Sequence, residues 1–225
     1  MSFRIGRVFG YRRIFGHAAA VFVERGIANK DTLEMASLSA EPSEDSSFIC
    51  SIFEVPKYGV SSVNSENSEG LFCPNTGKIS DAFREREEEF DIRLDVPYVD
   101  LPNNAETKPE DEPGKLGILC CKWTDKEYID FWGQTRYIHK YQEQGIPTIW
   151  DWGCQSGLKP CPLYLRHCLI AANNLGEECY RSFLDETYLV DRQTTVRQYL
   201  ESEDGLWDKV MSLAPPPGLS LRYNG

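Results

Sequence analysis

The residues best suited to acid–base chemistry lie in one charged segment, 81–90, whose sequence is DAFREREEEF. Three consecutive glutamates, Glu87 to Glu89, precede an aromatic residue, Phe90. A carboxyl group partly buried against an aromatic ring has its pKa raised toward neutrality, so it can take up a proton and return it. On composition alone the favoured interpretation is a solvated helix whose charges pair at i,i+3 and i,i+4, which is typical of charge runs. The alternative is a single-carboxylate general acid/base.

Cysteine and histidine are weaker candidates for catalysis or metal binding. The eight cysteines include no C-x-x-C pair, and His17, His139 and His167 are far apart in the chain, so we expect no metal and no cofactor. Free thiols are favoured over a disulfide framework in a chain of this size without a signal-peptide pattern. Cys120 and Cys121 lie in an apolar stretch, where burial raises thiol pKa values and disfavours redox chemistry.

An aromatic stretch, Ile146 to Pro162, is a second candidate for ligand binding. Trp150 and Trp152 could line a groove, with Arg166 and His167 at the start of the following helix. The favoured alternative is that the tryptophans pack the helices onto the sheet. The charged residues further along are interpreted as helix-end charges and caps rather than as a catalytic dyad: Asp185, Glu186, Asp191 and Arg192.

The order of motifs around the charged segment resembles that of the γ-glutamylcyclotransferase-like family. A Gly-Tyr-Arg-Arg strand at Gly10–Arg13 comes first, and an apolar strand ending in Phe53-Glu54-Val55 follows it. The pair Arg86-Glu87, with the aromatic Phe90 three residues on, closes the series. The resemblance covers roughly residues 8–99 of this chain.

The resemblance implies both a reaction and a catalytic residue. In that family the glutamate of the Arg-Glu pair is the acid/base, which assigns the role to Glu87, with Glu85 and Glu88 as alternatives if the register shifts. The substrate would be a small γ-glutamyl compound, as in glutathione metabolism, whose α-amine attacks its own γ-carbonyl to give 5-oxoproline. Both reactants are tethered, so a catalyst has mainly to move protons. No metal or cofactor is required.

The family also has a Tyr-Gly-Ser loop whose backbone N–H groups hold the substrate carboxylate. One alignment places Phe9–Arg13 there, with Arg12 and Arg13 where Gly and Ser would stand, and a side chain at the glycine position blocks close backbone approach. A second alignment places Gly10–Phe15 on the family's second strand, so that the loop has no counterpart in this sequence. The alternative function is therefore a non-catalytic binding or interaction module of the same fold.

The pattern of apolar residues predicts an α+β fold. Strands are expected at Val8–Phe15, Ala19–Val23, Ala36–Leu38 and Phe48–Val55, with a turn at Glu41–Ser47, and together they suggest a small, mixed, barrel-like sheet. Beyond Gly117 one more buried strand, Ile118–Cys121, precedes a helical half. Helices are expected at three places: Thr124–Gln144, which opens with a capping box at Thr124 and Glu127, Leu163–Asn174 and Val190–Leu200.

These elements define one domain with a helical extension. Residues 1–122 form the β-rich core, 123–211 the extension packed on it, and 212–225 a Pro-rich tail. Two polar stretches inside the core, near 58–80 and 100–115, are rich in Ser, Asn, Glu, Gly and Pro, so we expect disordered surface insertions there.

Composition excludes several classes of partner. Of 225 residues, 41% are hydrophobic and 26% are charged, which is close to the globular average. The formal net charge of −11 repels phosphate backbones, and no Lys/Arg stripe offsets it. No uninterrupted signal-peptide core follows the N-terminus, and no run approaches the roughly 18 apolar residues that a membrane span needs. We therefore expect a cytoplasmic protein that binds neither nucleic acid nor membrane.

Overall fold

The computed structural model describes residues 3–53, 79–101 and 114–223. Within these ranges the chain combines a six-stranded mixed sheet with helices, which confirms the predicted α+β class. No described helix has the length and apolar character needed to cross a membrane.

Two long antiparallel strands, β1 (Phe3–Ala18) and β2 (Glu34–Phe53), form the central ribbon. Their register shifts at Gly10, whose φ is +76°, because Phe9 pairs with Ser47 whereas Tyr11 already pairs with Pro42. The predicted turn at Glu41–Ser47 is therefore a bulge within one bent strand and does not separate two strands.

The connection between the two long strands corrects the sequence prediction. The strand expected at Ala19–Val23 is wrong, because helix α1 (Ala20–Glu24) lies there. Val21 and Val23 favour a strand by type, but one helical turn lets Ala20 and Phe22 become buried together. Tertiary packing thus outweighs the local preference of the two valines.

A second antiparallel pair lies beside the ribbon. β3 (Asp91–Asp100) pairs with β4 (Lys115–Cys121), which confirms the strand predicted at 118–121, and β3 also pairs with β1 through Gly6 to Val8. Helix α2 (Asp81–Arg86) precedes β3 and begins at Ser80, whose hydroxyl accepts the Phe83 N–H at 3.2 Å. The charged segment is thus helical only up to Arg86.

The helix predicted over Thr124–Gln144 is divided into three pieces. Its capping box is confirmed, since Thr124 and Glu127 satisfy each other's backbone N–H groups at the start of α3 (Asp125–Trp132). Gly133, with φ of +92°, interrupts the helix in a conformation that glycine adopts readily. The pieces that follow it are α4 (Gln134–Lys140) and the 3-10 turn η2 (Gln142–Gln144).

The C-terminal part holds five α-helices among the described residues. The prediction at 163–174 is confirmed by α5, but the helix predicted from Val190 begins only at Val196, because Asp191 accepts the N–H groups of Gln193 and Thr194 and folds the chain into a turn. The elements in chain order are β5 (Lys159–Pro160), α5 (Pro162–Asn174), α6 (Glu177–Asp185), β6 (Thr187–Leu189), α7 (Val196–Glu201), α8 (Leu206–Met211), the 3-10 turn η3 (Pro217–Leu219) and α9 (Ser220–Tyr223).

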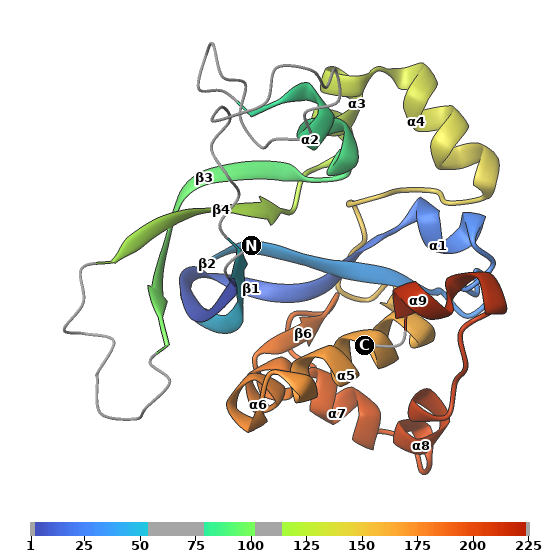
Figure 1. Ribbon diagram of the computed structural model, residues 1–225. Helices are drawn as coiled ribbons and strands as arrows, with labels where there is room; N and C mark the ends of the chain where they lie inside the picture. Colours follow the sequence, from blue (N-terminus) through green and yellow to red (C-terminus); the bar gives the residue numbers. More distant parts are fainter. Residues whose placement is uncertain (1–2, 54–78, 102–113, 224–225) are drawn as a thin grey trace, which may run out of the picture.

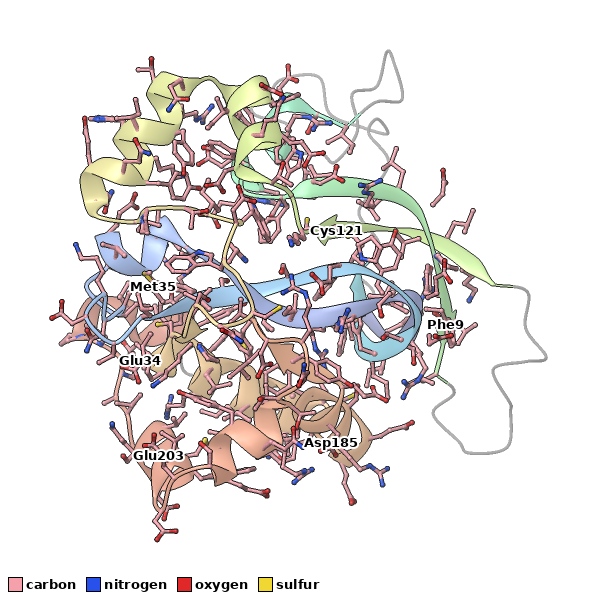
Figure 2. All side chains as sticks on the ribbon, turned by 180° about the vertical axis from the view of Figure 1, so that it is seen from behind. Phe9, Glu34, Met35, Cys121, Asp185 and Glu203 are labelled. Atoms are coloured by element: carbon pink, nitrogen blue, oxygen red, sulfur yellow. The ribbon has the colours of Figure 1, made fainter. Side chains whose placement is uncertain are left out.

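The strand order in the sheet is β5-β2-β4-β3-β1-β6, with β1 and β2 also paired to each other. Strands β1, β2, β4 and β3 therefore follow one another round a ring, but β2 and β4 meet through a single residue pair, Ala40 and Cys121, so the described strands form no closed barrel. The ribbon separates two groups of elements: α2 to α4 with β3 and β4 on one side, and α5 to α8 on the other (Figure 1). Cys121 and Asp185 mark these two sides in Figure 2.

The main hydrophobic core is shared between the predicted β-rich part and the helical extension. Its fully buried members come from the ribbon, from α3 and α4, and from the C-terminal helices, and include Phe15, Met35, Tyr128, Tyr141, Trp150, Leu165 and Leu169. The extension also supplies the two outer strands β5 and β6. The two predicted parts thus fold around one core.

The predicted insertions lie mostly outside the described residues, at 58–78 and 102–113. At their described margins, Ser80 caps α2 and Lys115 donates to Asp100 across the β3–β4 ends at 2.5 Å. The Pro-rich tail predicted at 212–225 is anchored in its described part, because Tyr223 is buried and its hydroxyl accepts a hydrogen bond from Arg25 at 2.6 Å.

Candidate functional site

Glu87 lies directly after helix α2, at the position that ends it. Its side chain is 28% exposed, and one carboxylate oxygen, Oε1, accepts a hydrogen bond from Arg86 Nε at 3.0 Å. Cys120 of β4 lies near it: burial first, and then the negative charge of Glu87, raise the pKa of the Cys120 thiol to about 12. That thiol is therefore protonated at neutral pH.

The two alternative glutamates have different surroundings. Glu85 is exposed on α2. Glu88 is only 5% exposed and forms ion pairs with Arg136, at 2.7 Å, and with Lys140, both on α4. A buried carboxylate held by two cations links the segment after α2 to α4.

Glu89, the third consecutive glutamate, belongs to a buried polar cluster that sequence reasoning missed. Tyr141 donates its hydroxyl to Glu89 Oε1 at 3.0 Å, and His17 Nε2 of β1 lies 3.4 Å from Glu89 Oε2. Burial first, and then the Glu89 charge, raise the pKa of Tyr141 far above its ordinary value, so its hydroxyl remains a hydrogen-bond donor. His17 is fully buried, stacked on Trp150 with ring centroids 4.3 Å apart.

Two tryptophan side chains fix the backbone of this glutamate segment. Trp132 Nε1 donates to the Glu88 carbonyl at 3.0 Å, and Trp150 Nε1 donates to the Glu89 carbonyl at 2.9 Å. Because both indoles are held in the packed core or against α4, the chain after α2 has a defined path. The backbone that follows Glu87 is thereby fixed by hydrogen bonds.

Asp125, the first residue of α3, holds the loop that carries Trp150. Its buried carboxylate accepts the backbone N–H groups of Ile149 at 3.0 Å and Trp150 at 2.8 Å, and the Tyr137 hydroxyl at 2.6 Å. Asp125 therefore supports the glutamate segment indirectly, through Trp150. Sequence reasoning used this stretch only for its capping box.

Arg12 and Arg13 of β1 have their side chains engaged inside the fold. Arg12 Nε lies 3.2 Å from the buried carboxylate of Glu41, which also forms a two-pronged ion pair with Arg192 at 2.9 and 3.0 Å. Arg13 donates to Thr187 Oγ1 at 2.7 Å and to a β2 carbonyl, and burial lowers its pKa to about 10. Both residues thus lie in a strand, with side chains bonded inside the fold.

The tryptophans of the aromatic stretch 146–162 pack in the hydrophobic core. Trp150 is buried and Trp152 is packed against the main core, which confirms the interpretation that the tryptophans join helices to the sheet. Arg166 donates to the Met211 and Tyr223 carbonyls, and burial lowers the pKa of His167, which lies between aromatic rings. These groups hold the C-terminal segment in place.

The remaining charged candidates are also structural. Asp185 forms a two-pronged pair with Arg197, at 2.6 and 3.0 Å, and Glu186 is paired with Arg7 at 3.0 Å. Asp191 caps its own turn. The structure therefore supports the interpretation of these acids as helix-end charges and caps.

Two surface pockets of the described residues have charged linings. The larger, about 610 Å³, is lined by charged side chains of α1, α4 and η2, and the smaller, about 270 Å³, lies between β1 and α6. Glu87 lines neither of them. Seven described cysteines are free thiols, and within the described ranges no group of three or more His, Cys, Asp or Glu side chains is placed to hold a metal ion.

Comparison of the sequence with family models, with curated proteins and with solved structures found no match.

Proposed function

We propose that this protein is a γ-glutamylcyclotransferase in which Glu87 is the general acid/base. The observation that supports the proposal is the distinct state of Glu87 among the three candidate carboxylates. Glu85 is exposed, and Glu88 is neutralised by Arg136 and Lys140. Glu87 alone of the three is both partly shielded and reachable, with its second oxygen, Oε2, without a hydrogen-bond partner in the described part of the chain.

The reaction can be written with the protein's own residues. Glu87 removes a proton from the α-ammonium group of a γ-glutamyl compound, and the freed amine attacks the γ-carbonyl carbon, so that a carbon–nitrogen bond forms and closes the ring. Collapse of the tetrahedral intermediate breaks the original amide bond, and the leaving nitrogen takes that proton from Glu87. The attacking nitrogen loses its second proton to solvent as the ring closes, and the released amine takes one proton from solvent. Over the cycle the α-nitrogen loses two protons and the leaving amine gains two, so atoms and charge balance.

The rigid support beneath Glu87 suits this role. Trp132 and Trp150 hold the next two carbonyl groups in the chain, which limits the positions that the Glu87 side chain can sample. A carboxylate fixed beside a tethered nucleophile and leaving group needs only small movements to exchange protons with both. The packing around the segment is therefore consistent with a group that transfers protons in two directions.

The test is release of 5-oxoproline from a panel of γ-glutamyl amino acids, γ-glutamyl amines and glutathione. We expect turnover by the parent chain and a fall of about 100-fold or more in kcat for Glu87→Gln, the usual range for loss of a general acid/base. Glu85→Gln, on the exposed face of α2, is the matched control and should keep the parent rate. Equal rates for the parent and Glu87→Gln would refute the assignment.

The second candidate function is a non-catalytic binding module of the same fold. The observation that favours it is the engagement of Arg12 and Arg13 in internal pairs, which leaves that part of β1 without an open backbone loop for a carboxylate. The same panel separates the two functions. Turnover of any γ-glutamyl compound that depends on Glu87 excludes the module, and binding of such a compound without 5-oxoproline release supports it.

A further inference from the structure

We propose that Arg86 is the residue that binds the α-carboxylate of the substrate, next to Glu87. The inference rests on the proposed function, because it assigns the substrate-binding contact for the same site. A γ-glutamyl compound carries a carboxylate and an ammonium group on one carbon. A protein that cyclises it needs hydrogen-bond donors for the first group, from a cation or from backbone N–H groups, beside the base that deprotonates the second.

The guanidinium of Arg86 is held in place, but only one of its three nitrogens donates a hydrogen bond within the described residues. Its Nε donates to Glu87 Oε1 at 3.0 Å, and its plane lies over the Phe83 ring, with the central carbon 4.9 Å from the ring centroid. The two terminal nitrogens have no hydrogen-bond partner in the part of the chain that the structure describes, and the side chain is 63% exposed. Two contacts thus orient the group while its outer edge faces solvent.

That outer edge has the geometry that a carboxylate requires. The guanidinium is a planar fork of five N–H donors, and two of its nitrogens can donate in parallel to the two oxygens of one carboxylate. Stacking on an aromatic ring limits the orientations of the fork, so less freedom is lost on binding. A substrate carboxylate on the terminal nitrogens brings the neighbouring α-nitrogen toward Glu87 Oε2, the oxygen that Arg86 leaves open.

Three other arginines on this side of the molecule have partners other than Glu87. Arg136 is held by Glu88, with its guanidinium 4.3 Å from the Trp132 ring centroid. Arg93 is paired with Asp91 at 2.5 Å. Arg84, the other arginine of α2, stacks on Phe131, with its central carbon 5.1 Å from that ring centroid. Arg86 is the one of these four that contacts Glu87.

The kinetic experiment uses γ-glutamyl-L-alanine and four forms of the full chain: the parent, Arg86→Gln, Arg86→Lys and Arg84→Gln. We expect Arg86→Gln to raise KM by about 10- to 100-fold, the effect of losing a charge-assisted bidentate contact, while kcat changes by less. Arg86→Lys keeps the positive charge but lacks the planar guanidinium, so its KM should lie between those of the parent and Arg86→Gln. Arg84→Gln is the matched control and should keep the parent KM. A KM for Arg86→Gln within twofold of the parent overturns the inference.

A binding measurement separates this inference from the proposed function. L-Glutamine and 4-aminobutanamide both carry the amine and the amide, but only glutamine has the α-carboxylate. Titration of the parent should show binding of glutamine at least 10-fold tighter than binding of 4-aminobutanamide, and Arg86→Gln should remove the difference. If the chain releases no 5-oxoproline but this difference is found, the reaction is refuted and the carboxylate contact stands. Equal binding of both compounds, or binding of neither, overturns the contact.

Discussion

Replacement of Asp125 by alanine tests how the structure holds the glutamate segment. The carboxylate is buried and accepts two backbone N–H groups, from Ile149 and Trp150, together with the Tyr137 hydroxyl. Alanine removes all three acceptor contacts at once. The Tyr137 hydroxyl retains the Pro147 carbonyl at 3.2 Å, but the two backbone donors are left buried without partners.

The expected cost follows from these two orphaned donors. Each buried donor left unsatisfied costs about 1–3 kcal/mol, so two of them cost about 2–6 kcal/mol. We therefore expect Asp125→Ala to lower the free energy of unfolding by about 3–5 kcal/mol, which corresponds to a fall in Tm of roughly 6–20 °C for a chain of this size. Asp125→Asn keeps one acceptor and should lose less.

Urea unfolding at neutral pH, followed by tryptophan fluorescence, measures the effect. The matched control is Asp130→Ala on the same helix, because Asp130 is 61% exposed and, among the described residues, pairs only with Lys126. An exposed i,i+4 pair contributes at most about 0.5 kcal/mol. A loss for Asp125→Ala that stays within about 1 kcal/mol of the control would show that the carboxylate does not hold the 149–150 backbone, and the support assigned to Glu87 would fail with it.

Two further predictions concern the C-terminal half. A hydrogen bond from Arg197, and then its charge, lower the pKa of Asp185 from 3.8, so their contribution is present above that value and is lost as pH falls through the lower folded value. Both groups are more than a third exposed, so Arg197→Gln should cost less than about 1 kcal/mol at pH 7, and urea unfolding should show the difference from the parent shrinking toward pH 3; a constant difference would contradict the linkage. Tyr223→Phe removes the hydroxyl that accepts from Arg25 and should cost about 0.5–1.5 kcal/mol, whereas Tyr223→Ala also empties a buried site and should cost about 3–5 kcal/mol. Thermal unfolding of both variants checks this, and an unchanged Tm for Tyr223→Ala would mean that the last helix does not anchor the chain.

The sequence predicts the elements whose signals are local. The capping box at Thr124 and the helix expected at Leu163–Asn174 are confirmed; the first depends on cap residues that act on their own backbone neighbours, and the second begins at Pro162, a residue well suited to a first helical position. The strand predicted at 118–121 also forms. The sequence predictions fail where a contact between residues far apart in the chain determines the secondary structure. Ala19–Val23 is helical because Ala20 and Phe22 bury together in one turn.

Helix α6 shows a different limit, since its sequence contains a signal that the prediction did not use. Gly176, with φ of +107°, precedes Glu177 and Glu178, and acidic residues in the first turn favour a helix start. Cys179 and Phe183 follow at helical spacing on the buried face. The polar residues around them obscure this pattern, and it becomes clear only once the core position of Phe183 is known.

The glutamate segment shows why a site is harder to predict than a fold. Glu87, Glu88 and Glu89 are chemically identical in the sequence. If helix α2 continued through them, the helical repeat alone would decide which face of the helix each side chain lies on. The helix ends at Arg86, so that rule no longer applies, and partners 44 to 61 residues away in the chain fix the segment: Trp132 and Trp150 bind the backbone carbonyls of Glu88 and Glu89, and Tyr141 binds the Glu89 side chain. Glu89 is 14% exposed and Glu88 is 5% exposed and paired with Arg136 and Lys140, which leaves Glu87, beside Arg86, as the most exposed of the three carboxylates. The resemblance that singled out Glu87 left Glu88 open, and the difference between these two follows from the contacts of Glu88 with α4, which no local pattern contains.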